Sequence, residues 1–501
     1  MDMKNGKTSK KINILICILM VLAIITFSYA QFNQNFAWCL AGVMLLFICN
    51  VILGLKSIKT RFLFLIFQIP FFTFLVSRPF IGIITKVDGW MGSGQQKGNI
   101  VFAFILVFLS LFFMQIGAVG MDSLCQIQRK KCLNCLEKTE NEFVHKLQFF
   151  SLMIFGVTMI FYMIVQIEPL LFMRGKTYIE FYSEYKSELP GYFHTIASFM
   201  KYSLCIFLAT MPRKKLAIVP LILYVLSAIP MLFIGVRNPF MLNCLFVMIY
   251  FFVRDIKKSK EKWIGAFEKA GLIISTPFVL AFMSVYSFIR SQSEVQELNL
   301  FKQVFDFFYQ QGTTFNALQI AYGYREGIKS LNNHYTFGGM LDYIKHGTVG
   351  QKIWGSEPLP SGNCEINGIY SNSLAHNLSY ISMKEDYLSG RGRGSSYLLE
   401  TYFDWGYVGV ILFSVFLGAL FIFFLHRFGH NVLESTIILV SLTSIYFIPR
   451  AEATGWLTFI VTIQFWLCIC VIYFATYCCL KLKRMKDANF SKNKKRNNAE
   501  E

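Results

Sequence analysis

The residues best suited to chemistry in this sequence lie in one short segment, residues 390–409, which reads GRGRGSSYLLETYFDWGYVG. Its glycines let backbone N–H groups approach an anion closely, and Arg391 and Arg393 offer forked donors that match phosphate oxygens. An apolar run follows directly, so the segment predicts an anion site at the start of a helix that enters a membrane. The glycines are not a nucleotide-binding fingerprint, because no strand precedes them and no Lys-Ser/Thr pair follows.

Two carboxylates follow these glycines. Glu400 and Asp404 stand one and two turns after Ser396, so the three side chains share a helix face if the helix has begun there. A second carboxylate one turn away makes the first a better general base. Glu400 also has a purely structural interpretation, because the helix dipole favours a carboxylate in the first turns of a helix. The other candidate base is His376, in SLAHNLSY, whose alternative is an ordinary hydrogen-bonding role in a loop.

Four further arginines stand at the predicted outer ends of apolar runs. They are Arg78 in SRPF, Arg237 in GVRNPF, Arg290 in FIRS and Arg450 in IPRA. A cation in a membrane span costs on the order of 2.5–3.5 kcal/mol at the midplane and less near the end, so snorkelling to the interface explains each one singly. Together with the two arginines of GRGRG, they predict one outer cavity that holds a diphosphate through bidentate contacts, which lysine makes poorly.

The elements that must position these residues are membrane helices. The chain has 501 residues, of which 55% are hydrophobic and 17% aromatic, and its mean hydropathy is +0.48. Nearly charge-free runs long enough to cross ~30 Å of hydrocarbon recur along it without the alternation of a β-barrel. We therefore predict an all-α polytopic membrane protein with about twelve transmembrane helices. The predicted spans are 12–30, 36–55, 62–81, 100–119, 149–168, 195–211, 216–234, 239–253, 271–289, 406–425, 432–448 and 457–479.

Lysine and arginine set the expected orientation, because short loops rich in these residues stay in the cytoplasm. Both termini are predicted there. The predicted parts are membrane helices over 1–289, a large extracytoplasmic loop domain with short helices over 290–405, further membrane helices over 406–480 and a basic cytoplasmic tail over 481–501. Within the loop, we expect residues 300–330 to form a helix on the bilayer surface and residues 335–371 to be mostly irregular.

Charge and cysteines exclude other classes of protein. The net charge of +19 belongs mostly to the inner loops and the tail, so topology and anionic membrane lipid explain it and no nucleic-acid partner is predicted. The thirteen cysteines lie mostly in predicted spans, which argues against a disulfide framework. Cys132 and Cys135 form a CxxC pair, but no second ligand pair stands at a matching spacing, so no metal site is predicted.

The chain resembles the O-antigen polymerases, Wzy-type membrane glycosyltransferases that join lipid-linked oligosaccharide repeat units. The resemblance rests on the layout, with a large outer loop before the last three spans, and on two local patterns. GVRNPF at residues 235–240 is similar to the family's Gly-x-Arg turn, and residues 390–409 are similar to its G-x-G-x-x-S…E…G signature. O-antigen ligases share the arginine turn, but they carry a His-Asn pair where this chain has Ser395 and Ser396.

The resemblance implies metal-independent glycosyl transfer between polyprenyl-diphosphate-linked sugars at the outer face of a bacterial plasma (inner) membrane. Glu400 is then the general base, with His376 as its rival, and arginine stabilises the charge on the departing diphosphate. The implied diphosphate-binding residues are Arg78, Arg237, Arg290, Arg391, Arg393 and Arg450, and the supporting residues are Gly390, Gly392, Gly394, Ser396, Tyr397 and Asp404. No cofactor is expected, and the expected partners are the lipid-linked oligosaccharide, membrane lipid and a chain-length regulator protein.

Two alternatives stay open at this stage. A flippase or exporter of lipid-linked oligosaccharide should carry charged residues near the midplane of several helices, whereas these spans hold almost none, Lys201 being the clearest. An O-antigen ligase shares the chemistry and differs only in the acceptor. The sugar identity, the linkage and the stereochemical course have no signal in the sequence.

Overall fold

The computed structural model describes residues 6–87, 89–91, 96–131, 142–176, 180, 185–257, 261–266, 268–271, 273–274, 279 and 300–500. Every regular element in these ranges is helical. Ten helices within them are long and apolar enough to cross a membrane, which confirms the all-α polytopic fold. The ten coincide with ten of the predicted spans. The predicted span 195–211 corresponds to α8 (Gly191–Ala209), a helix that is not among these ten. The predicted span 271–289 falls largely outside the described residues.

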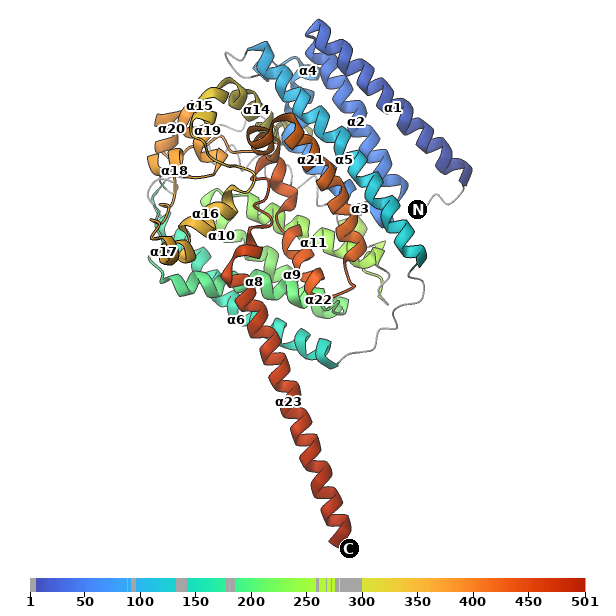
Figure 1. Ribbon diagram of the computed structural model, residues 1–501, viewed down its shortest axis with the longest axis vertical. Coiled ribbons are helices and arrows are strands. Elements are labelled where there is room, and N and C mark those ends of the chain that lie inside the picture. Colours follow the sequence, from blue (N-terminus) through green and yellow to red (C-terminus); the bar gives the residue numbers. More distant parts are fainter. Residues whose placement is uncertain are drawn as a thin grey trace.

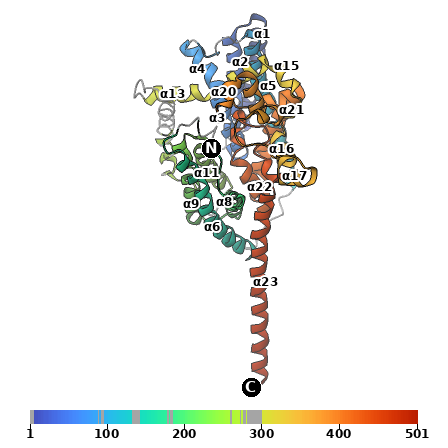
Figure 2. The ribbon, with the colours of Figure 1, turned by 90° about the vertical axis from the view of Figure 1, so that its left-hand side faces the viewer.

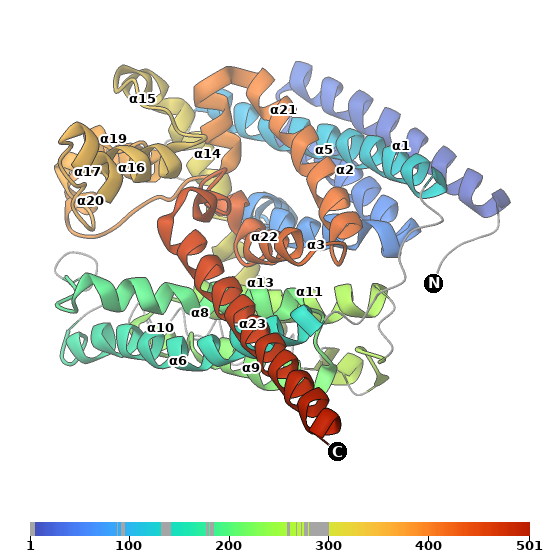
Figure 3. The same ribbon diagram turned by 60° about the horizontal axis from the view of Figure 1, so that its bottom comes forward.

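The long helices form two packed groups, which Figure 3 shows as two layers. The first group contains α1 (Gly6–Asn33), α2 (Phe36–Lys56), α3 (Ile58–Phe71), α5 (Lys97–Lys131) and α21 (Tyr397–Arg427). The second contains α6 (Glu142–Phe172), α8, α9 (Lys214–Leu226), α10 (Ile229–Ile234), α11 (Asn238–Ile256) and α23 (Ile463–Glu500). Helix α22 (Val432–Leu442) contacts both α8 and α21 and so connects the groups.

Helices α5 and α21 approach each other closely because glycines face the contact. A Cβ at Gly117 of α5 would overlap the Val415 carbonyl oxygen of α21, and one at Gly418 of α21 would overlap the Met114 carbonyl oxygen. Small residues at a helix crossing allow such backbone proximity in membrane proteins. The contact fixes the position of α21, which carries Glu400 near its N-terminus.

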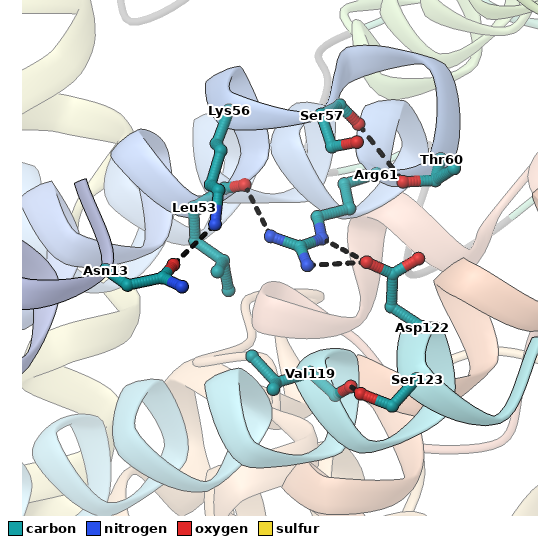
Figure 4. A network of polar contacts seen from close by, with 9 residues as sticks. All are labelled: Asn13, Leu53, Lys56, Ser57, Thr60, Arg61, Val119, Asp122 and Ser123. Carbon is teal, nitrogen blue, oxygen red and sulfur yellow. Dashed lines mark hydrogen bonds and ion pairs between the residues drawn. The ribbon is translucent and has the colours of Figure 1, made fainter. Parts of the chain in front are cut away.

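A buried ion pair joins three helices of the first group (Figure 4). Arg61 of α3 donates from Nε to Asp122 Oδ2 of α5 over 2.9 Å, and its Nη1 donates to the Leu53 carbonyl of α2 over 3.1 Å. Breaking a buried pair leaves an uncompensated charge, so Arg61 and Asp122 depend on each other.

The short helices that follow α13 (Leu300–Gln311) gather on one side of the molecule, opposite both termini (Figure 3), while α13 lies apart from them against α4 (Ser77–Thr85) (Figure 2). We call residues 300–388 the short-helix domain. Its helices are α13 (Leu300–Gln311), α14 (Thr314–Gly323), α15 (Arg325–Ser330), α16 (Gly338–His346), α17 (Thr348–Trp354), α18 (Glu365–Tyr370), α19 (Leu374–Ser382) and α20 (Lys384–Leu388). Figure 2 shows that α23 extends away from all other helices toward the C-terminus, so the predicted tail from 481 continues a membrane helix.

Two expectations about this domain are wrong. Residues 335–371 are mostly helical, because α16, α17 and α18 fall within them. Some glycines of this stretch stand at the ends of these helices, as Gly347 and Gly355 do, and others, such as Gly350 and Gly368, lie inside them. Residues 300–330 form three helices where one was expected. Of these, α14 packs on α5 and buries Phe315 and Leu318 completely, so protein and not a bilayer surface covers its apolar face.

Candidate functional site

Glu400 lies at the point where a membrane helix meets the short-helix domain. Helix α21 begins after Ser396, whose hydroxyl accepts the Leu398 N–H and caps the helix. Glu400 is fully buried in the first turn. Its Oε1 accepts the Ser395 hydroxyl over 2.7 Å and its Oε2 accepts the Ala453 N–H over 2.7 Å. Glu400 therefore ties the start of α21 to the loop after Arg450, and its hydroxyl partner is Ser395, whereas Ser396 serves as the cap.

Asp404, one turn further on, holds a different loop. Its carboxylate accepts the N–H of Tyr335 over 3.0 Å and the N–H of Thr336 over 2.7 Å. The helix is interrupted directly afterwards at Trp405 and Gly406, where Gly406 has a φ of 61° that favours glycine. Asp404 thus binds two backbone donors and fixes the chain that leads into α16.

A third carboxylate, Glu452, has no role in the sequence-based predictions. It belongs to the loop between η2 (Ile445–Arg450) and η3 (Thr458–Val461), one residue beyond the IPRA motif that drew attention to Arg450. A Cβ at Gly339 of α16 would lie 2.8 Å from Glu452 Oε2, so the carboxylate lies against the bare backbone of α16. Burial raises the pKa of Glu452 and the Asp342 charge raises it further, while a hydrogen bond from Ser373 opposes both.

Asp342 and His376 complete this region. Asp342 of α16 accepts the Ser371 hydroxyl over 2.8 Å and the Asn372 N–H over 3.0 Å, which fixes the entry to α19. In α19, His376 Nδ1 lies 2.8 Å from the Tyr387 hydroxyl, which donates to the Cys364 carbonyl over 3.1 Å. Because the phenol has one proton, Nδ1 carries the shared hydrogen and Nε2 the lone pair.

Burial lowers the pKa of His376, and the nearby Asp342 charge opposes that shift. The neutral ring, which is the form a base needs, is therefore favoured near neutral pH. We call Asp342, Glu400, Asp404 and Glu452 the carboxylate site, beside which His376 lies.

The GRGRG segment is pinned to the short-helix domain by its own arginines. Arg391 Nη1 pairs with Asp386 of α20 over 2.9 Å, and Arg393 Nε donates to Ser382 of α19 over 2.8 Å. Both arginine side chains are exposed. The backbone is left-handed at two of the predicted glycines, with φ of 100° at Gly390 and 78° at Gly394, whereas the φ of Gly392 is not positive.

Two of the predicted outer-end arginines converge on the end of α13. Arg450 Nη1 donates to the Gln311 carbonyl over 3.2 Å. The Arg78 guanidinium lies 4.4 Å from the centre of the Tyr309 ring, and a Cβ at Gly312 would lie 2.6 Å from the Arg78 Cβ. Arg78 follows a π-helical turn, η1 (Phe72–Val76), a feature that often marks functional positions in helices.

The remaining predicted residues lie elsewhere. Arg237 stands between α10, which ends at Gly235 with a φ of 106°, and α11, so the predicted turn between two helices is present. The Tyr397 hydroxyl lies 2.6 Å from Ser110 Oγ and joins α21 to α5. Arg290 lies outside the described residues, as do Cys132 and Cys135. Within the described ranges, no group of three or more His, Cys, Asp and Glu side chains is arranged to hold a metal ion.

These features define an integral membrane protein of many helices with a carboxylate site near the start of a membrane helix, beside the short-helix domain. Residues 14–483 match the family described as O-antigen polysaccharide polymerase Wzy, so the chain belongs to that family, as the resemblance in sequence predicted. The family acts on lipid-linked oligosaccharides and has a polymerase activity of the membrane glycosyltransferase type. Neither the curated proteins nor the solved structures contain a match to this chain.

Proposed function

We propose that this protein joins lipid-linked oligosaccharide repeat units into a surface polysaccharide at the outer face of the bacterial plasma membrane. A hydroxyl of one unit attacks the anomeric carbon of the growing chain, and the lipid diphosphate departs. The observation that carries the proposal is the buried carboxylate of Glu400, bonded to Ser395 and Ala453 where a membrane helix enters the short-helix domain. The proton acceptor belongs to this region, and Glu400 and His376 are the candidates that the sequence suggests.

The lipid diphosphate needs cationic groups near the membrane. Arg78 and Arg450 approach the same end of α13 from two different membrane segments, and both are only partly buried. Arginine forks match phosphate oxygens and can stabilise the charge on a leaving diphosphate without a metal ion. We assign the diphosphate to this pair, with Arg237, Arg290, Arg391 and Arg393 as further proposed contacts.

The proposed orientation puts the short-helix domain outside the cell and both termini in the cytoplasm. It is supported by the basic inner loops and by the position of both termini on the side away from that domain (Figure 3). Fusions after Gly362 and after Glu501 test it, each made with a reporter that works only outside the cytoplasm and with one that works only inside. The fusion after Gly362 should be active with the outside reporter, and the fusion after Glu501 with the inside reporter. The reverse pattern would rule out an outward-facing site.

Purified protein in detergent, mixed with lipid-linked repeat units, tests the activity. We expect a ladder of longer products that persists with a chelator present, because no metal ion takes part in the proposed transfer. No membrane barrier exists in detergent, so an exporter would leave single units unchanged. In a second reaction with a lipid A core added as acceptor, transfer to that core without extension of the units themselves would identify a ligase. Adding a chain-length regulator protein should change the length distribution while extension continues.

The arginine pair gives a separate prediction. Arg450→Lys keeps the charge but loses the planar fork, so we expect roughly a 10- to 100-fold lower rate of extension, corresponding to one or two charge-assisted hydrogen bonds. Arg78→Lys should behave in the same way. The matched control is Arg325→Lys, since Arg325 stacks on Tyr322 at the edge of the short-helix domain. Equal rates for Arg450→Lys and Arg325→Lys would remove the diphosphate assignment.

A further inference from the structure

We propose that Glu452 is the catalytic base that takes the proton from the attacking hydroxyl, and that Glu400 is a positioning residue that holds Glu452 in place. This inference rests on the proposed function. It adds Glu452, which is not part of the sequence patterns shared with the family. It also changes the role of Glu400, which is part of them, from base to positioning residue.

The first reason is that the carboxylate of Glu400 is already hydrogen-bonded to protein donors. Both of its oxygens accept hydrogen bonds at 2.7 Å, one from Ser395 and one from the Ala453 N–H, and its side chain is fully buried. Because the side chain is fully buried, a substrate hydroxyl could reach these oxygens only if the surrounding chain moved. Ala453 is the residue directly after Glu452, so the bond to its N–H fixes the backbone that carries Glu452.

The second reason is the partial exposure of Glu452. This residue is only partly buried, whereas Glu400 is fully buried, and its Oε2 lies against Gly339, where a Cβ would come within 2.8 Å of it. Gly455, in the same loop, is exposed. Glu452 and the nearby Gly455 therefore keep some solvent exposure, which the fully buried Glu400 lacks.

The third reason is an unpaired hydroxyl nearby. Thr336 Oγ1 is buried, with the residue 1% exposed, and has no hydrogen-bond partner among the described residues. The Thr336 N–H donates to Asp404, and its carbonyl accepts the Thr454 hydroxyl over 2.6 Å, so Thr336 lies between Asp404 and the Glu452 loop. Buried hydroxyls are normally satisfied, so a shift of the Glu452 loop that admits the acceptor sugar would give this hydroxyl a partner.

The step then balances as follows. The acceptor hydroxyl oxygen forms a bond to the anomeric carbon of the growing chain, while the bond between that carbon and the diphosphate oxygen breaks. The lipid diphosphate leaves with the bonding electron pair, and the hydroxyl proton passes to the ionised carboxylate of Glu452. Release of that proton to water restores the carboxylate for the next unit.

The pH dependence follows from the surroundings of Glu452. The groups that act on it are Asp342 on α16, Ser373 before α19 and Glu400 on α21, and burial together with the Asp342 charge raises its pKa. A base works only when it is deprotonated. Extension should therefore rise with pH and level off above the pKa of Glu452, which is higher than that of an ordinary glutamate.

The test compares variants of the full-length purified protein on lipid-linked repeat units across a pH series. Glu452→Gln should lower kcat roughly 100- to 10,000-fold with little change in KM, and its residual rate should lose the rise with pH. Glu452→Asp should recover part of the rate and keep the rise. Glu326→Gln, at an exposed glutamate of the short-helix domain, is the control and should match wild type.

A second pair of variants leaves every charge in place. Gly339→Ala puts a methyl group against Glu452 Oε2 and should slow extension roughly tenfold, whereas Gly156→Ala on α6, where a methyl group meets open space, should not. If wild type extends units and Glu452→Gln does so with the same rate and pH profile, Glu452 is not the base. If wild type itself makes no longer products, the proposed function fails first.

Discussion

Replacing Glu400 by glutamine will abolish chain extension and leave single lipid-linked units intact. The carboxylate accepts from two donors at once, the Ser395 hydroxyl and the Ala453 N–H. An amide has only one acceptor oxygen, so its NH₂ group must face one of these donors in a fully buried site. An unsatisfied buried donor costs about 1–3 kcal/mol, which is enough to move the Glu452 loop away from its working position. Sugar ladders from cells that express the variant will show the loss.

The comparison needs equal amounts of protein in the membrane, because a buried substitution also lowers stability. Glu326→Gln is the control, since its carboxylate is largely exposed and should leave the ladder unchanged. The second variant, Ser395→Ala, removes one donor and keeps the carboxylate, so it should shorten the ladder without abolishing it. A full ladder from Glu400→Gln at a normal protein level would show that Glu400 neither acts as a base nor positions one.

The features that sequence predicted well depend on local patterns. Apolar runs long enough to cross a membrane predicted ten helices at their observed places, because hydropathy and length act within one segment. The turn at residues 235–240 and the helix entry after Ser396 were also visible, since Gly235 must adopt a positive φ and a serine caps α21. The assignment of Glu400 at that entry as the general base stays a prediction.

The features that sequence missed depend on contacts between distant segments. Glu452 enters the site because Ala453 binds Glu400, which is 53 residues away, and no spacing rule connects the two. Asp404 shares a helix with Glu400, but the structure uses it to hold the chain at residues 335–336. That six arginines share one site stays a prediction; the structure brings Arg78 and Arg450 together at α13 and pairs Arg391 with Asp386, and Arg290 lies outside the described residues.

The irregular stretch expected at residues 335–371 was wrong for a related reason. Glycines are typical of loops, yet Gly338 lies at the start of α16, where a side chain would overlap the Asn372 carbonyl. Because Gly338 has no side chain, α16 can pack closely against the chain before α19. Composition alone cannot distinguish a glycine that bends the chain from one that admits a neighbour.

Substituting alanine at Gly117 will destabilise the protein and reduce extension, although the site lies far along α5 and α21 from Glu400. The added methyl group meets the Val415 carbonyl oxygen, which is backbone and can move only if α21 moves. Overpacking of this kind costs about 1–3 kcal/mol. Gly418→Ala presses on the Met114 carbonyl from the opposite helix and should have a similar effect. The thermal midpoint of the detergent-solubilised protein measures the loss.

The control lies on the same helix. Gly120 is exposed, and a methyl group there meets nothing within 4 Å, so Gly120→Ala should be neutral or slightly stabilising because alanine favours a helix. The two substitutions add the same methyl group at positions three residues apart, and they differ only in the atoms that the methyl group meets. A Gly117→Ala protein as stable as Gly120→Ala would mean that α5 and α21 are not in backbone contact. The position of Glu400 would then need another explanation, since this contact fixes the helix that carries it.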